Sequence, residues 1–179
     1  MKSNHAPVIA VFGGSRAQPH HVEYEHAHTL GKLLARAGFV VLNGGYAGTM
    51  EASARGAKEN GGRTIGVVAR EFGDLEPNAH LDETITREDL FARIREMHAR
   101  ADGFVALKGS MGTLAELAIV WNLAKIDGTA RKPIVLIGEW WHPILQAWRE
   151  YLAVTEEEAN LLTIVSRPEE AVTLLIKLF

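Results

Sequence analysis

The chain has 179 residues, of which 47% are hydrophobic and 23% charged. This length and balance predict one globular domain over residues 1–179. With 19 Lys and Arg against 22 Asp and Glu, the formal charge of -3 gives no basic footprint for nucleic acid or an anionic membrane. There is no cysteine, which excludes disulfides, thiolate metal sites and cysteine nucleophiles.

No apolar run approaches the roughly 20 residues of a membrane span. The N-terminus does not resemble a signal peptide, so we expect a cytoplasmic protein.

Apolar runs that suit strands buried on both faces alternate with segments of helical periodicity. In chain order, the predicted elements are a strand at 7–14, a helix at 21–37, a strand at 39–42, a helix at 49–60, a strand at 64–69, a loop at 70–84, a helix at 86–101 with a capping box at Thr86 and Asp89, a strand at 103–107, a helix at 113–126, a strand at 133–137, a helix at 143–153, a short strand at 161–165 and a helix at 168–179. This alternation predicts an α/β fold. We expect a doubly wound parallel sheet of Rossmann-like type with helices on both faces and the order 3-2-1-4-5.

Three glycine-rich loops follow predicted strands. Their candidate phosphate-binding residues are Gly13, Gly14 and Ser15; Gly44, Gly45, Gly48, Thr49 and Met50; and Lys108, Gly109, Ser110, Met111, Gly112 and Thr113. Glycine lets backbone N–H groups approach an anion, and the helix that follows adds the positive end of its dipole. In the predicted order, the first and third loops flank the switch point of the sheet, where ligands bind. The alternative is that all three are tight turns that need glycine for geometry alone.

The loop sequences favour a mononucleotide or a sugar phosphate over NAD or ATP. None of them spells G-x-G-x-x-G, and the second strand ends in Asn43 without an acid for a ribose hydroxyl. No Gly-Lys-Ser/Thr sequence is present. We therefore expect a nucleoside monophosphate or a related phosphate ligand, and no bound cofactor.

Two charged residues stand out beside these loops. Arg93 adjoins the apolar stripe of its helix, so it is either partly buried with an anionic partner or lies along the surface with its head in water. Glu116 lies three residues after Thr113. That spacing fits a capping box, and it also fits a carboxylate that faces the crevice as a base or as a stabiliser of positive charge.

Three other features of the sequence indicate a binding function more weakly. Glu71, just past the third strand, is a weak candidate for a ribose or base contact. Four histidines gather near the first helix without acids at ligand spacing, and no metal site is predicted; they are His20, His21, His26 and His28. The pair Trp140-Trp141 favours packing or an interface over base stacking.

The stretch from Met97 to Glu116 resembles the LONELY GUY family, whose motif P-G-G-x-G-T-x-x-E follows an Arg helix of the form R-K-x-x-M. Arg93 and Met97 fall at the Arg and Met of that helix. The motif itself is matched by Gly109, Gly112, Thr113 and Glu116. Further similar segments cover most of the chain, namely Val11 to Ser15, Gly44 to Met50, Trp121, and Lys132 to Leu136.

The resemblance implies a phosphoribohydrolase. Such enzymes cleave the N-glycosidic bond of an N6-modified adenosine monophosphate and release the base, a cytokinin, with ribose 5-phosphate. It implies that residues 109–113 hold the 5′-phosphate and that Arg93 and Glu116 form the catalytic pair. It also implies a homodimer or an assembly of dimers. Many relatives carry the label "lysine decarboxylase", but the sequence shows no sign of a pyridoxal-phosphate site.

The chain departs from the family pattern at several positions. Lys108 replaces the Pro of the motif, Ser110 its second Gly, and Ile94 the Lys after the Arg. Val120 stands where a substrate-contacting Thr is common, and Glu51 replaces a Gly in the second loop. These differences indicate an outlying branch, similar also to relatives that carry molybdenum cofactor. The alternative function is therefore a non-catalytic carrier or sensor of a nucleotide or of molybdenum cofactor.

Overall fold

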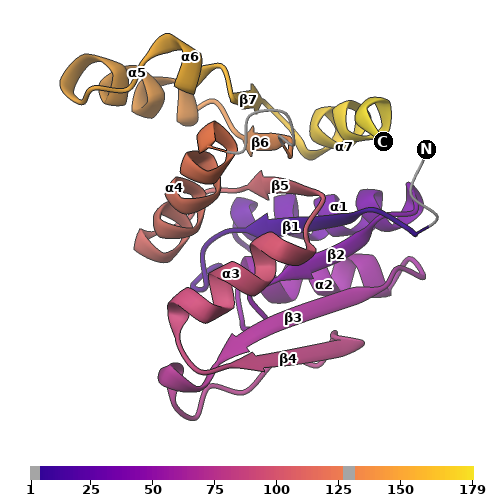
Figure 1. The fold of residues 1–179 in the computed structure, drawn as a ribbon. Coiled ribbons are helices and arrows are strands. Elements are labelled where there is room, and N and C mark those ends of the chain that lie inside the picture. Colours follow the sequence, from indigo (N-terminus) through magenta and orange to yellow (C-terminus); the bar gives the residue numbers. More distant parts are fainter. Residues whose placement is uncertain (1–4, 127–131) are drawn as a thin grey trace.

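The computed structural model describes residues 5–126 and 132–179. The described strands form one parallel sheet in the order β4-β3-β2-β1-β5-β6-β7 (Figure 1). The strands are β1 (Val8–Phe12), β2 (Val40–Asn43), β3 (Thr64–Ala69), β4 (Glu83–Arg87), β5 (Gly103–Ala106), β6 (Ile134–Ile137) and β7 (Leu162–Val165). The fourth and fifth predicted strands, at 103–107 and 133–137, correspond to β5 and β6. The predicted order 3-2-1-4-5 is therefore the observed order β3-β2-β1-β5-β6, and it is confirmed for these five strands.

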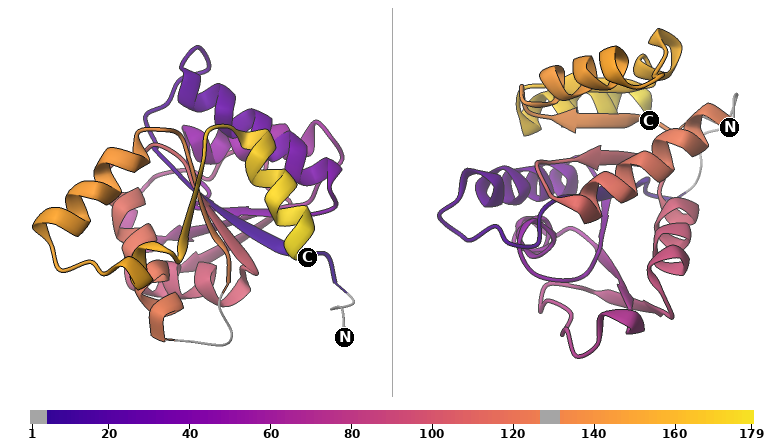
Figure 2. Two further views of the ribbon diagram at one scale, coloured as in Figure 1. Left: turned by 90° about the horizontal axis from the view of Figure 1, so that it is seen from above. Right: turned by 90° about the vertical axis from the view of Figure 1, so that its left-hand side faces the viewer.

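Helices cover both faces of the sheet (Figure 2). They are α1 (Val22–Arg36), α2 (Thr49–Lys58), α3 (Leu90–Arg100), α4 (Met111–Ile126), α5 (Trp141–Tyr151), α6 (Glu156–Ala159) and α7 (Pro168–Leu178), with a 3-10 turn η1 (Arg70–Phe72). Helices α1, α2 and α7 cover one face, and α3, α4 and α5 cover the other. The predicted Rossmann-like α/β fold is confirmed.

The central strands are apolar on both sides because each side meets a layer of helices. In β1, Ile9 and Val11 belong to the core that includes residues of α1, α2 and α7. Ala10 and Phe12 point the other way, into the core shared with α3, α4 and α5. This explains the near-continuous apolar run of β1, which is typical of strands buried on both faces.

The prediction of a loop over residues 70–84 followed by a helix from residue 86 is partly wrong. Residues 83–87 form β4 at the edge of the sheet, where only Ile85 is buried, so the apolar signal of a strand is weak. The capping box predicted at Thr86 is also wrong, because α3 begins at Leu90. Its N-cap is Asp89, whose carboxylate accepts a hydrogen bond from Ala92 N at 2.7 Å.

Two short helices were not predicted, η1 in the expected loop and α6 after α5. Helix α6 begins with a capping box in which Thr155 Oγ1 and the Glu158 carboxylate each accept from the other residue's backbone N–H. Within residues 5–126 and 132–179, no helix has the length and apolarity that crossing a membrane requires.

Candidate active site

The loops that follow β1 and β5 line one cleft at the switch point of the sheet. Gly14 N donates to Lys108 O at 3.2 Å, which ties the two loops together. The cleft measures about 420 Å³ and is lined by Gly14, Ser15, Arg16, Ala17, His21, Glu23, Lys108, Gly109 and Ser110. The prediction that the first and third loops share a crevice is therefore confirmed.

The second glycine loop closes the same edge. Gly44 and Gly45 follow β2, and Gly48 precedes α2. Thr49 is buried, and both its backbone N and its Oγ1 donate to Gly14 O, at 3.0 and 3.2 Å. All three predicted loops therefore meet at the carboxyl ends of the strands.

The third loop leads directly into α4. A Cβ on Gly109 would lie 2.0 Å from Thr113 Oγ1, so only glycine lets this backbone approach the first turn of the helix. Ser110, Met111 and Gly112 are exposed, whereas Thr113 is buried. The first N–H groups of a helix have no acceptor within it, and they form a site of positive potential next to Gly109 and Ser110.

Arg93 is buried in α3 and held by two hydrogen bonds. Its Nε donates to Val67 O at 2.7 Å, and its Nη1 donates to Glu116 Oε1 at 2.8 Å. The interpretation of Arg93 as a buried residue with an anionic partner is thus confirmed. Among the described residues, Nη2 has no hydrogen-bond acceptor, so this nitrogen is available to a ligand.

Two neighbours fix the Arg93 guanidinium from other sides. A Cβ on Gly44 would lie 1.8 Å from Nη2 and 2.5 Å from Met50 Sδ, so the second loop needs glycine there to admit the Arg93 side chain. The Phe72 ring centroid lies 5.7 Å from Arg93 Cζ, in the range of a cation–π contact. Phe72 also packs on the small apolar cluster of Tyr46, Met50 and Val68.

Glu116 is not part of a capping box. Helix α4 begins at Met111, so Thr113 lies inside its first turn, and the Glu116 carboxylate bonds Arg93 instead. The capping interpretation is therefore wrong. Burial raises the pKa of Glu116, and the Arg93 charge opposes that rise. Oε2 accepts no hydrogen bond from the described part of the chain.

Arg93 and Glu116 do not line the cleft; the pair lies against the second glycine loop, where Gly44 packs on Arg93 Nη2. Glu116 follows Met111, the first residue of α4, by five positions, an axial rise of roughly 7–8 Å at 1.5 Å per residue. One helix therefore places its N-terminus at the cleft and a carboxylate about one and a half turns away.

Lys108 projects at the mouth of the cleft. Its Nζ donates to Glu23 Oε1 at 2.9 Å and lies 5.7 Å from the centroid of the Trp140 ring. Trp141, the next residue, is buried in the core, in line with the packing role predicted for this pair.

Several residues that the sequence singled out as possible ligand or metal contacts instead bond other parts of the protein, outside the cleft. Glu71 Oε2 accepts from Leu90 N at 2.9 Å, at the start of α3. His28 pairs with Glu59. No cluster of three or more potential metal-ligating side chains occurs in residues 5–126 and 132–179. Val120 is buried in the core.

Two residues that shape the site, Phe72 and Asn43, were not predicted as site residues from the sequence. Asn43 is fully buried and bonds Met50 O and Ser53 Oγ through Nδ2, while its Oδ1 accepts from Gly45 N. A polar residue that ends an apolar strand just before Gly-Gly is a signal for such a loop anchor. Phe72 carries no comparable signal, because its neighbours come from distant segments.

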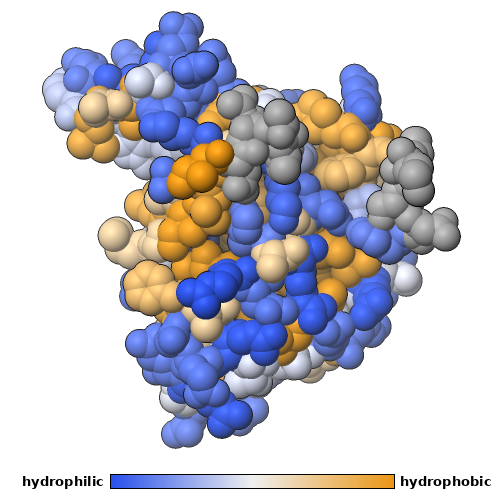
Figure 3. Space-filling model, viewed as in Figure 1, coloured by the Kyte–Doolittle hydropathy of each residue, from blue (hydrophilic) through white to orange (hydrophobic). Residues whose placement is uncertain are grey.

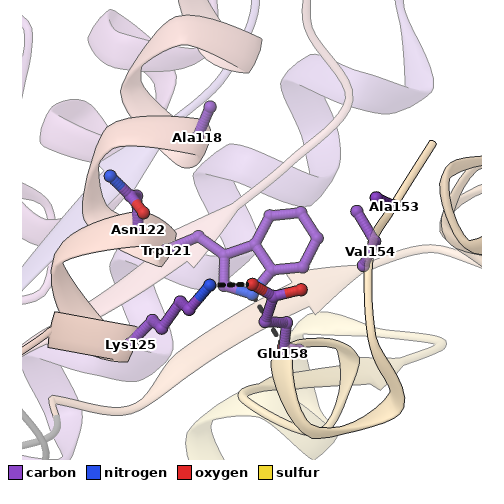
Figure 4. A pocket seen from close by; sticks show the side chains of 7 residues that line it. All are labelled: Ala118, Trp121, Asn122, Lys125, Ala153, Val154 and Glu158. Atoms are coloured by element: carbon purple, nitrogen blue, oxygen red, sulfur yellow. Dashed lines mark hydrogen bonds and ion pairs between the residues drawn. The ribbon is translucent and has the colours of Figure 1, made fainter.

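A second cavity of about 200 Å³ lies between α4 and the segment from the end of α5 to α6 (Figure 4). The Trp121 ring faces Val154 across it, and Lys125 pairs with Glu158 at its rim. Trp121 Nε1 donates to Glu158 O at 2.8 Å. None of the predicted site residues lines this cavity.

Fold and site place the chain among Rossmann-like α/β proteins with glycine loops at the switch point. It belongs to the SLOG cluster4 family, whose model matches residues 6–172. It is 37% identical over 136 residues to a cytokinin riboside 5'-monophosphate phosphoribohydrolase of Mycobacterium tuberculosis, which covers 74% of this chain and 72% of that one. It is 34% identical over 134 residues to cytokinin riboside 5'-monophosphate phosphoribohydrolase LOG7 of Arabidopsis thaliana, over 72% of this chain and 60% of that one. The predicted resemblance to the LONELY GUY family is confirmed.

Solved structures of similar fold cover nearly the whole chain. The molybdenum cofactor binding protein of Rippkaea orientalis has a TM-score of 0.78 and 28% identity, over 98% of this chain and 99% of that one. The molybdenum cofactor carrier protein of Chlamydomonas reinhardtii has a TM-score of 0.74 and 26% identity, over 97% and 98%.

Proposed function

We propose that the protein is a phosphoribohydrolase that cleaves the N-glycosidic bond of a nucleoside 5′-monophosphate. The observation that carries this proposal is the buried Arg93–Glu116 pair, 2.8 Å apart, beside the glycine loops. A buried ion pair is a poor device for stability alone, since taking both charges out of water is costly. Perturbed groups next to a cleft are typical of catalytic sites.

The chemistry follows from the free atoms of the pair. As the C1′–N bond breaks, its electrons leave with the base, which takes up a proton, and positive charge builds on the ribose. The Glu116 carboxylate stabilises that charge and then accepts a proton from the water that attacks C1′. Release of this proton, which balances the one taken up by the base, returns Glu116 to its carboxylate form. Through Nη1, Arg93 opposes the burial that raises the pKa of Glu116 and so favours the ionised carboxylate, while Nη2 is left to contact the substrate. The products are the free base and ribose 5-phosphate.

The phosphate end of the substrate fits the N-terminus of α4. Residues 109–113 offer backbone N–H groups and the helix dipole, and Lys108 adds a positive charge at the cleft mouth. The loops of Gly13 to Ser15 and Gly44 to Met50 complete the enclosure. The names of the curated relatives support an N6-modified adenosine monophosphate as substrate.

The second candidate function is a carrier of molybdenum cofactor. Solved structures that cover nearly the whole chain carry that description, at 26–28% identity. A phosphate-binding cleft at the switch point serves a phosphorylated pterin as well as a nucleotide. The departures at Lys108 and Ser110, both in the cleft lining, keep this candidate open.

We also propose a single-domain cytoplasmic protein that forms a homodimer. One continuous sheet through the described residues supports the single domain. For the dimer, the support is an apolar stripe along α4 on the face shown in Figure 3. Met111 and Ile126, at its two ends, are 77% and 68% exposed, and Ala118 between them is also exposed. A contiguous exposed apolar stripe is a feature of protein–protein interfaces.

A hydrolysis screen separates the two candidates. The purified protein is incubated with adenosine monophosphate, N6-modified adenosine monophosphate and other nucleoside monophosphates, and free base and ribose 5-phosphate are quantified. Release of both in equal amounts supports the hydrolase. A bound pterin in the purified protein, together with no release from any nucleotide, supports the carrier.

A further inference from the structure

The phosphate cleft contains one acidic side chain among basic ones. Of its lining residues, Arg16, His21 and Lys108 can carry positive charge, and Glu23 alone is a carboxylate. A carboxylate in a cleft that receives an anion weakens binding through like-charge repulsion. The Glu23 carboxylate is therefore expected to affect which anionic ligands the cleft binds.

Glu23 is firmly tied to Lys108. It lies in the first turn of α1, and its Oε1 accepts from Lys108 Nζ at 2.9 Å. This hydrogen bond and the Lys108 charge lower the pKa of Glu23, so that the carboxylate stays ionised at neutral pH. The two side chains are 23% and 57% exposed, which puts the ion pair at the cleft mouth, within reach of an entering ligand.

Lys108 is positioned on a second side by Trp140, whose ring centroid lies 5.7 Å from Nζ. The lysine is thus held at the cleft mouth even when its bond to Glu23 is exchanged for a bond to a ligand. That exchange leaves the Glu23 carboxylate in the cleft without its counter-charge.

We propose that Glu23 is a specificity residue that restricts the cleft to ligands with a single terminal phosphate. The inference rests on the proposed function, which places the phosphate on residues 109–113. One phosphate is compensated by the N-terminus of α4 and by Lys108. A second phosphate in the same cleft meets the released Glu23 carboxylate, so nucleoside diphosphates are selected against.

The test is calorimetry with two ligand pairs, adenosine mono- and diphosphate, and inorganic phosphate and pyrophosphate, without divalent cations. Wild type should prefer the monophosphate of each pair. Glu23→Gln should raise affinity for the diphosphates about tenfold and for the monophosphates clearly less, because it removes the repelling charge. Glu23→Ala should do the same, which separates charge from side-chain geometry. Glu25→Gln, an exposed position on the same helix, is the matched control and should change neither.

Equal gains for mono- and diphosphates, or no gain, would overturn the inference. So would failure of wild type to bind any of the four probes. Selective monophosphate binding that depends on Glu23, in a protein that hydrolyses no nucleotide, would instead uphold the inference and overturn the proposed hydrolase function.

Discussion

Arg93 and Glu116 form an ion pair that joins α3 to α4, two helices that belong to different crossover connections of the sheet. Arg93 Nη1 lies 2.8 Å from Glu116 Oε1, and both side chains are at most 10% exposed. The pair links α3, which precedes β5, to α4, which follows it. One oxygen of Glu116 and one nitrogen of Arg93 have no partner in the described residues, so the pair combines a structural link with free polar atoms.

Stability should depend on the pair as a unit. Arg93→Ala or Glu116→Ala alone leaves an unpaired buried charge and should cost about 3–5 kcal/mol of unfolding free energy. The double substitution Arg93→Met with Glu116→Leu should recover most of that loss while remaining inactive. Denaturant unfolding measures both effects. Glu88→Ala, which removes an exposed ion pair with Arg70, is the control and should cost about 0–1 kcal/mol. A double variant as unstable as the single ones would contradict this account.

The pH profile of hydrolysis should show the raised pKa of Glu116. Burial raises this pKa above the roughly 4.3 of an ordinary glutamate, and the proposed reaction needs the carboxylate ionised. Activity should therefore fall, as the pH is lowered, at a midpoint above about 4.3. For stability the sign is opposite: the Glu116 contribution is largest below the unfolded-state pKa and is lost as pH rises through the folded-state pKa. A kcat/KM profile that is flat through this region would count against Glu116 as the group that titrates.

Gly44→Ala should impair catalysis, although Gly44 itself has no side chain that could take part in the reaction. Its Cβ would lie 1.8 Å from Arg93 Nη2, so the guanidinium has to move. A displacement of about 1 Å in a catalytic group can cost about 10²-fold in rate, and a loss of that order is expected. Gly61→Asn is the control, because no atom lies within 4 Å of a Cβ there and Asn tolerates its positive φ of 74°. Normal kcat in Gly44→Ala would show that the Arg93 position is not critical.

The apolar face of α4 should be an interface between two copies. Light scattering should give twice the 19.6 kDa of the chain, and Ala118→Arg should yield the monomer. A charge placed in the middle of an apolar interface is costly to bury, which is why one substitution suffices. Lys32→Glu, on α1 across the sheet, is the control and should leave the dimer intact. A wild-type mass of one chain at micromolar concentration would refute the dimer.

The sheet and the site differ in how far the sequence predicts them. The buried strands were found because apolar runs and glycine stops are local signals, whereas β4 was missed because an edge strand buries only Ile85. In the sequence, Arg93 stands out beside an apolar stripe and Glu116 by its spacing from Thr113, and the family resemblance pairs them. Their contact, and the Phe72 ring beside it, come from segments far apart in the chain. Glu116 fitted a capping box by spacing alone, and the start of α4 at Met111, together with the bond to Arg93, decides against it.

The most direct test of the central claim compares Glu116→Gln with wild type for release of base and ribose 5-phosphate. The amide oxygen of Gln can still accept from Arg93 Nη1, so the variant should fold and bind nucleoside monophosphate. It cannot stabilise a positively charged ribose or accept a proton, so turnover should fall at least about a hundredfold. Glu25→Gln, exposed on α1, should retain wild-type turnover. Near-normal hydrolysis by Glu116→Gln would contradict the catalytic assignment, and absence of hydrolysis by wild type on every nucleoside monophosphate would contradict the function itself.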